Sequence, residues 1–311
     1  MLSILSSPKP FTGIVQTLQL NALRSWLEIC SDNEVILYGE SEGASAIAQE
    51  LNIKHIAHIQ TNEYGTPLFN AIANHAKENA KYDFQVYINS DIILTPDFMS
   101  TLQQINSPQF LMIGQRFDLH EDVTWNYADK NWHVQLKNLS DLGKISLHAP
   151  SGSDYFAYKR GLWDDLPSIT IGRGGYDNAL IKYVLENRFP VIDATRSVQA
   201  IHQFHDYGHM ASGRQEVFEG PEALKNREFA GHHGVPSLTD ATWAIDNNHY
   251  YRNFSRGDWM RFLECQCRFV YKSELLGFVC RQLRRILHRL GLSKQRDLRQ
   301  KDLLNALTAI F

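Results

Sequence analysis

Residues 84–94 read FQVYINSDIIL, an apolar run that turns polar at Asn89-Ser90-Asp91 and then becomes apolar again. Aromatic and β-branched residues in a short run predict a buried strand, and the polar tripeptide predicts a turn at its carboxyl end. Further apolar runs alternate upstream with stretches of helical spacing: 2–7, then 14–30, 34–38, 43–51, 54–59 and 67–80. This β-α-β-α order predicts an α/β fold with a mostly parallel sheet flanked by helices.

Polar residues at strand ends are the first candidates for a functional site, because ligands bind beyond the carboxyl ends of parallel strands. Asp91 ends the central run. One carboxylate at a strand end suits Mg²⁺ or Mn²⁺ when the phosphates of a ligand supply other oxygens. A turn in which Asp91 accepts local backbone N–H groups is the alternative.

The second half of the chain carries two further polar segments. Residues 172–181 run from a glycine loop into a helix start, where Asp177 suits either a helix cap or a carboxylate that accepts a hydroxyl proton. Residues 200–209 hold three histidines within eight positions. Neutral imidazole binds Mn²⁺ well, so His202 and His205 are candidate metal ligands, and hydrogen bonding within a packed loop is the alternative.

Composition narrows the class of protein. The 311 residues carry a net charge of −3, which gives no general attraction to nucleic acid. The N-terminal stretch MLSILSSPKPF does not have the pattern of a secretory signal, and no apolar run of about 18 residues predicts a membrane span. Four cysteines in a chain of this length form neither a disulfide framework nor a zinc pattern. We therefore expect a cytoplasmic protein.

The C-terminal part differs in charge. Residues 261–311 hold eleven Lys and Arg against four Asp and Glu, a net of +7, while the first 260 hold 20 against 30, a net of −10. Apolar residues recur at helical spacing over 262–290, and Arg281, Arg285 and Arg289 lie four apart on another face. We expect a helix that either packs on the rest of the chain with a solvated basic edge or lies on an anionic membrane surface.

The order and spacing of the motifs resemble the GT-A type of glycosyltransferase, in a bacterial group that is similar to family 2. The resemblance covers about residues 1–215. It rests on an Asn-x-x-Gly turn, a helix with a second Asn, a strand that ends in a DXD-type motif, and three later elements: Asn62 to Gly65, Asn70, Asn89 to Asp91, SGSDYF at 151–156, GRGGYDN at 172–178 and HQFHDY at 202–207. The chain departs from the family pattern in having Asn89 where the DXD motif has its first acid.

The resemblance implies a Rossmann-like GT-A catalytic domain over 1–255, with a donor half at 1–100, an acceptor half at 101–255, and a basic amphipathic helical tail at 256–311. It implies a glycosyltransferase that moves a hexosyl or related group from a nucleotide-diphosphate sugar, with Mn²⁺ or Mg²⁺, to a glycan or lipid-linked acceptor. The implied roles are the base of an inverting reaction for Asp177; nucleotide contacts for Ser7, Lys9, Glu40, Asn62, Asn70, Asn89, Ser90 and Arg173; metal binding for Asp91, His202 and His205; and acceptor contacts for Asp154, Tyr155 and Tyr176.

Two other classes of function remain open from the sequence. A metal-dependent hydrolase built on the His and Asp residues of 200–209 would cleave a phosphoester without a nucleotide sugar. A non-catalytic GT-A-like protein would bind nucleotide or glycan and leave the donor intact, a reading that Asn89 favours. If the helix at 262–290 touches a membrane, we expect the protein to lie peripherally at the inner face of that membrane. A lipid-linked acceptor would then be the natural substrate.

Overall fold

The computed structural model describes residues 1–29, 32–129, 131–204, 213–231, 233–246 and 249–292. Within these residues, one main sheet has nine strands in the order β13-β12-β10-β6-β9-β4-β1-β2-β3. The strands are β1 Ser3–Ser6, β2 Glu34–Tyr38, β3 Lys54–Ile56, β4 Phe84–Ile88, β6 Leu111–Ile113, β9 Tyr155–Lys159, β10 Val191–Asp193, β12 Trp243–Asp246 and β13 His249–Arg252. Most neighbours pair in parallel, and β9 runs antiparallel between β4 and β6. This confirms the predicted α/β fold with a mostly parallel sheet.

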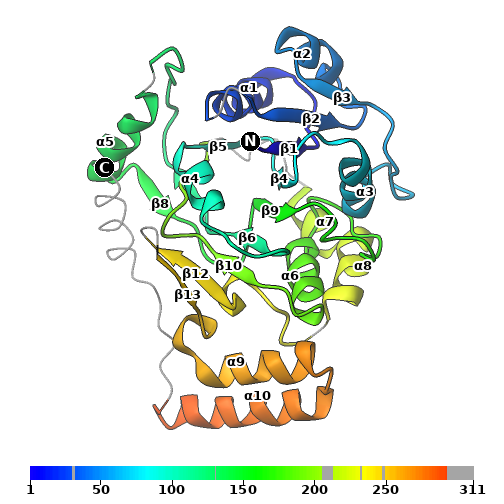
Figure 1. Cartoon of the computed structure of the whole chain (residues 1–311), viewed down its shortest axis with the longest axis vertical. Helices are drawn as coiled ribbons and strands as arrows, with labels where there is room; N and C mark the ends of the chain where they lie inside the picture. The colour runs from blue at the N-terminus through cyan, green and yellow to red at the C-terminus, as the bar shows by residue number, and fades with distance from the viewer. Residues whose placement is uncertain (30–31, 130, 205–212, 232, 247–248, 293–311) are drawn as a thin grey trace.

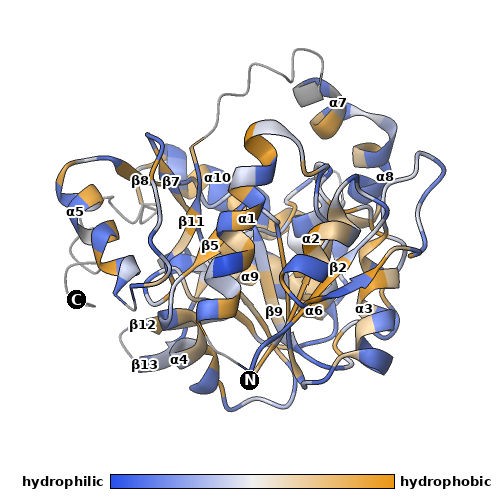
Figure 2. Cartoon of the chain, turned by 90° about the horizontal axis from the view of Figure 1, so that it is seen from above, coloured by the Kyte–Doolittle hydropathy of each residue, from blue (hydrophilic) through white to orange (hydrophobic). Residues whose placement is uncertain are grey.

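Alternation along β4 shows how the sheet is buried on both faces. Val86 and Ile88 pack into one core cluster, which includes Trp26, and Tyr87 packs into another, which includes Phe69. Because successive side chains of a strand point to opposite faces, the continuous apolar run in the sequence is what a strand covered on both sides requires. Figure 2 shows these hydrophobic strands at the centre of the molecule.

Helices cover the main sheet (Figure 1). They are α1 Gly13–Glu28, α2 Ala44–Glu50, α3 Phe69–Asn79, α4 Asp97–Gln103, α6 Tyr176–Glu186 and α8 Pro221–Ala230. Helix α7, Gly213–Glu219, packs against α8, and α5, Gln135–Asp141, packs against a second, smaller sheet. Helices α1, α2 and α4 contribute to the cluster of Val86, and α3 and α6 contribute to the cluster of Tyr87. No helix among the described residues is both long enough and apolar enough to cross a bilayer.

A smaller sheet lies beside the turn that follows β4. Its strands are β5 Ile92–Leu94, β11 Ala200–His202, β7 Phe117–Leu119 and β8 Ile145–Leu147, in that order. The sequence run 84–94 therefore divides, because its first part enters the main sheet and its second part pairs antiparallel with β11. The polar tripeptide between them is the point where the two sheets meet.

The C-terminal segment is a helical hairpin and not one helix. Helix α9 spans Trp259–Cys265, the π-helical segment η5 continues over Gln266–Val270, and α10 spans Glu274–Arg289. Lys272 has a positive φ of 52°, a left-handed conformation that ends a helix and reverses the chain. In Figure 1 the two helices lie side by side at one end of the molecule, with α10 outermost. The prediction of a helical extension is confirmed, and the continuous helix over 262–290 is wrong.

Candidate functional site

The antiparallel course of β9 places Asp154 next to the tripeptide that follows β4. Asn89 donates its backbone N–H to the Asp154 carbonyl over 2.9 Å, and its side-chain Nδ2 donates to Asp154 Oδ1 over 2.7 Å. Asp154 is 8% exposed. Two residues that lie 65 positions apart in sequence thus form one corner of the site.

The small sheet brings His202 to the same place. His202, at the end of β11, has its Nε2 atom 3.9 Å from Asp91 Oδ2 and its Nδ1 atom 3.5 Å from Asp118 Oδ1. Burial lowers the pKa of His202, although Asp91 acts in the opposite direction. The imidazole is therefore mainly neutral at neutral pH, which is the form that binds a metal ion.

Arg116 and Asp118, on either side of Phe117 in β7, link these groups. Arg116 bonds Asp118 through Nε over 2.8 Å and Asp154 through Nη1 over 3.0 Å. Burial opposes the charge of Arg116, yet the two carboxylates raise its pKa above the ordinary value. Burial likewise raises the pKa of Asp118, but His148 and Arg116 hold it below its usual range. The guanidinium therefore favours the ionised form of Asp118 in a partly buried site.

Sequence reasoning missed Arg116, Asp118 and His148. Arg116 and Asp118 are two residues apart, the spacing that puts both side chains on one face of a strand. His148 follows β8 and bonds Asp118 Oδ2 through Nδ1 over 2.8 Å. Alternation of side chains along residues 115–119 is the sequence signal that would have placed Arg116 and Asp118 together. The contact between Asp118 and His148 has no such signal, because it depends on how the strands pair.

Lys9 and α1 form the next part of the site. Lys9 Nζ lies 3.8 Å from Asp91 Oδ2, and the lysine side chain is 63% exposed. Gln19 of α1 accepts from the Lys9 backbone N–H over 2.8 Å and from Ser90 Oγ over 2.7 Å. Ser90 is 7% exposed and its hydroxyl is held within the protein by Gln19, and its role in nucleotide binding stays a prediction. Ser7, after β1, lies against Gly39.

A second polar cluster lies between the 62–66 turn and the glycine loop. Asn62 Oδ1 accepts from the backbone N–H of Tyr64 and Thr66, and its Nδ2 donates to Glu222 Oε1 over 2.6 Å. Arg173 Nε donates to Glu222 Oε2 over 2.6 Å. Glu222, which is 8% exposed and which sequence reasoning missed, thus ties the two loops together. The side chains of Asn62 and Arg173 are largely occupied by these contacts.

Glu40 and Asn70, the two other predicted nucleotide contacts, belong to neither of these polar clusters. Glu40, after β2, pairs with His58 over 2.7 Å at the surface, with 66% of its side chain exposed. Asn70, in the first turn of α3, has a buried Oδ1 atom with no hydrogen-bond partner among the residues described. The roles of both residues in nucleotide binding stay predictions.

Helix α6 presents Tyr176 and Asp177 at its first turn. Gly175, which precedes them, has a positive φ of 85°, a conformation that favours glycine. Burial, with Asp154 adding to it, raises the pKa of Asp177 to about 6, although backbone N–H groups of Asn178 and Ser153 act against this. Burial also raises the pKa of Tyr176 well above its ordinary value, with Asp154, Asp177 and Asp91 contributing. These carboxylates therefore share one electrostatic environment.

Tyr155 lies elsewhere. Its ring is fully buried, packs edge-on against Phe98 at 5.5 Å, and carries its hydroxyl next to the backbone at Gly114. The side chain of Tyr155 therefore belongs to the core of the sheet, and its role as an acceptor contact stays a prediction. Its neighbour Asp154 is the residue that reaches the site.

The donor set fits a divalent cation in part. Asp91 offers a carboxylate and His202 a neutral imidazole, both suited to Mn²⁺, with phosphates and water left to supply further ligands. His205, the third predicted ligand, lies outside the described residues. Among the residues that are described, no three His, Cys, Asp or Glu side chains gather as a metal site.

Comparison with known proteins finds similarity to solved structures at low identity. No family model and no curated protein matches the chain. TarS residues 1–349 of S. aureus, in complex with UDP-GlcNAc, is 14% identical, with 96% of this chain and 94% of that chain covered and a TM-score of 0.47. A mannosyltransferase from Pyrobaculum calidifontis, in complex with GDP-Man and Mn²⁺, is 12% identical, with 99% and 79% covered and a TM-score of 0.48.

A third structure is the glucosyl-3-phosphoglycerate synthase of Mycobacterium tuberculosis, in complex with Mg²⁺ and UDP. It is 14% identical, with 75% of this chain and 81% of that chain covered and a TM-score of 0.42. At these values the likeness concerns the general course of the chain, and neither a donor nor an acceptor passes from these proteins to this one.

Proposed function

We propose that this chain is a glycosyltransferase that moves a hexosyl or related group from a nucleotide-diphosphate sugar to an acceptor hydroxyl. One observation carries the proposal. Asp91, just after β4, lies within 4 Å of both Lys9 and His202, and Asp154 is hydrogen-bonded to Asn89 of the same turn. Such a group of charges can neutralise a diphosphate on one side and accept a proton on the other.

Asp91 and His202 are the residues that would hold Mn²⁺ or Mg²⁺, and a bound cation would neutralise the charge of a departing nucleoside diphosphate. Lys9 brings a further positive charge to the same edge, in a side chain that remains mostly exposed and free to approach a phosphate. Asn89 stands where the family motif has an acid, so this edge carries one negative charge fewer, and its amide donates a hydrogen bond to Asp154. The proposed donor site thus combines one carboxylate with two basic groups.

Asp177 is the proposed base. A carboxylate with a pKa of about 6 is ionised at neutral pH and is more basic than an ordinary Asp, which suits removal of a proton from an attacking hydroxyl. Direct attack by that hydroxyl on the anomeric carbon would invert its configuration. Asp154 and Tyr176, which line the same environment, are the proposed acceptor contacts. A glycan or a lipid-linked glycan is the proposed acceptor class, in the synthesis of a polysaccharide on the cytoplasmic side of a membrane.

Thermal-shift titration tests the donor site. UDP, GDP, CMP and dTDP would each be added with and without Mn²⁺ to the full chain and to its Asp91→Asn variant. We expect one nucleotide to raise the melting temperature in a way that requires Mn²⁺ and disappears in the variant. Asp83→Asn, just before the opposite end of β4 with an 82% exposed side chain, is the matched control and should retain the shift.

The titration, together with an assay for nucleotide release, separates the proposal from its rivals. Stabilisation by no nucleotide at millimolar concentration would argue against the donor site and in favour of a metal-dependent hydrolase. Stabilisation without release of nucleotide from any nucleotide sugar, with glycan acceptors present, would indicate a binding protein.

A further inference from the structure

The terminal hairpin, residues 259–292, turns an apolar face outward. Six apolar side chains of α10 and its C-cap residue, here called the outer stripe, are each between 43% and 73% exposed. They are Leu275, Leu276, Val279, Leu283, Ile286 and Leu290. Their spacing places them along one side of the helix. On Figure 1, α10 is the outermost layer at that end of the molecule.

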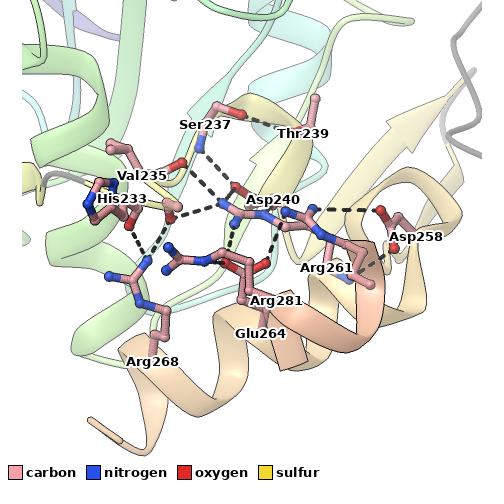
Figure 3. Close-up of polar contacts among 12 residues, drawn as sticks. His233, Val235, Ser237, Thr239, Asp240, Asp258, Arg261, Glu264, Arg268 and Arg281 are labelled. Carbon is pink, nitrogen blue, oxygen red and sulfur yellow. Dashed lines mark hydrogen bonds and ion pairs between the residues drawn. The ribbon is translucent and has the colours of Figure 1, made fainter. Parts of the chain in front are cut away.

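The opposite side of the hairpin is occupied by buried charges (Figure 3). Glu264 of α9 is fully buried, and it pairs with Arg281 over 3.0 Å and with Arg284 over 3.1 Å, both from α10. Arg261 holds α9 to the body of the protein, through Asp240 over 2.7 Å. The expectation that Arg281 belongs to a solvated basic edge is therefore wrong, because this arginine is 13% exposed and faces inward.

This polarity is the reverse of that of an ordinary surface helix. Such a helix buries its apolar face and shows its charged face to water. In α10, two arginines on the inner side form ion pairs with buried carboxylates. These ion pairs set the orientation of the helix, so the outer stripe faces solvent. A contiguous exposed apolar face of this kind marks a surface that another phase or molecule covers.

The basic residues beside the outer stripe indicate what kind of surface covers it. Arg285 and Arg289 are exposed on α10, and Lys272 is exposed at the hairpin turn. None of the three forms an ion pair with another residue of the described part of the chain. The first 260 residues carry a net charge of −10, whereas residues 261–292 hold seven Lys and Arg against two Glu, a net of +5, so an anionic surface attracts the hairpin end and repels the body.

We propose that the hairpin binds an anionic lipid surface, with α10 lying in the plane of the headgroups and the outer stripe entering the acyl boundary. An apolar face flanked by arginines has the composition of an interfacial helix. A second copy of this chain would bring its own Arg285 and Arg289 to the same face, where like charges repel. The proposal goes beyond the proposed transferase function and does not depend on it.

Vesicle flotation of the full chain tests this proposal. We expect flotation with vesicles of phosphatidylcholine that contain phosphatidylglycerol, weaker flotation at high salt, and none with phosphatidylcholine alone. Leu283→Asp, within the outer stripe, should abolish binding. Arg285→Glu should weaken it at least about fivefold, from the attraction of one cationic side chain to an anionic surface. Leu142→Asp, a leucine that is 69% exposed on another part of the molecule, and Arg24→Glu on α1 are matched controls that should bind normally.

Three results would overturn the proposal. They are absence of flotation with anionic vesicles, flotation that Leu283→Asp leaves unchanged, and a dimer in light scattering that Leu283→Asp dissociates while vesicles are ignored. Circular dichroism would establish that each variant is folded. Nucleotide should raise the melting temperature of Leu283→Asp and of the parent chain equally. If nucleotide stabilises neither chain, that result counts against the transferase function and leaves the membrane proposal untouched.

Discussion

Asp177 gives the sharpest expectation at the scale of a single residue. Its pKa of about 6 means that the carboxylate is protonated below that pH and is a competent base above it. We therefore expect kcat/KM for sugar transfer to rise as pH increases through about 6 and then to level off. Asp177→Asn should lower kcat by about 10²- to 10⁴-fold, the usual contribution of a general base.

The same shift has a consequence for stability, with the sign fixed by linkage. A pKa raised above the unfolded value contributes stability that is complete below about 3.9, the pKa of Asp in an unfolded chain, and that is lost as pH rises through about 6. Urea denaturation of parent and Asp177→Asn at pH 5 and 8 would show this as a difference between the two chains that depends on pH. Unchanged nucleotide stabilisation in the variant is the control, and a flat pH–rate profile would contradict the assignment of the base.

Individual site residues were predictable only where a residue ends a recognisable element. Asp91 follows an apolar run and Asp177 follows a glycine loop, so their places were evident from the sequence. Arg116 precedes and Asp118 lies within a strand of only three residues, so the period-two signal that would pair them is short and easily missed. The burial of Ser90 and Tyr155 was not predictable, because a position in or next to a motif does not tell which way the side chain points.

At the scale of elements, Gly277 fixes the distance between α10 and the rest of the hairpin. A Cβ atom at this position would lie 1.9 Å from Arg268 Cγ. Arg268 is held by Glu274 and by the backbone carbonyls of His233 and Gly234, so its side chain has little freedom to move aside.

We expect Gly277→Ala to destabilise the hairpin by about 1–3 kcal/mol, the cost of overpacking. This exceeds the gain of about 1 kcal/mol from replacing glycine by alanine within a helix. Hydrogen exchange over residues 259–289 would detect the faster opening. Gly152→Ala, where a Cβ atom meets nothing within 4 Å, should leave exchange in the hairpin unchanged. Slower exchange in Gly277→Ala would show that helix propensity prevails.

Elements with strong periodicity were predicted well, and connections between them were not. The strands and helices of the first 88 residues lie close to their predicted ranges, because each has a clear apolar pattern. The division of 84–94 between two sheets was not visible, since both halves are apolar. The reversal at Lys272 was not visible either, because the apolar spacing continues across it and no glycine or proline marks the turn.

For the molecule as a whole, the hairpin shares the core of the main sheet. Phe269 and Cys265 are 2% and 4% exposed and belong to the cluster that includes Phe69 and Tyr87. The boundary predicted near residue 255 therefore separates segments that pack together.

Phe269→Ala should accordingly lower the free energy of unfolding of the whole chain by about 3–5 kcal/mol, through loss of burial and the cavity left behind. Phe278→Ala, from the same hairpin but 53% exposed, should change it by less than about 0.5 kcal/mol. Urea denaturation measures both. Equal effects, or loss of hairpin signal without loss of the main transition, would show that the hairpin unfolds by itself.

The position of β9 between β4 and β6 has a consequence for synthesis of the chain. Residue 88 of β4 pairs with residue 155 of β9, so β4 keeps an open edge until the intervening residues have been made. At common rates of translation this interval is about 3–13 s. An exposed apolar strand edge is a template for intermolecular pairing. During this interval the nascent chain is therefore prone to aggregation, and a chaperone that covers the edge, or the rate of translation, would influence how much of it folds.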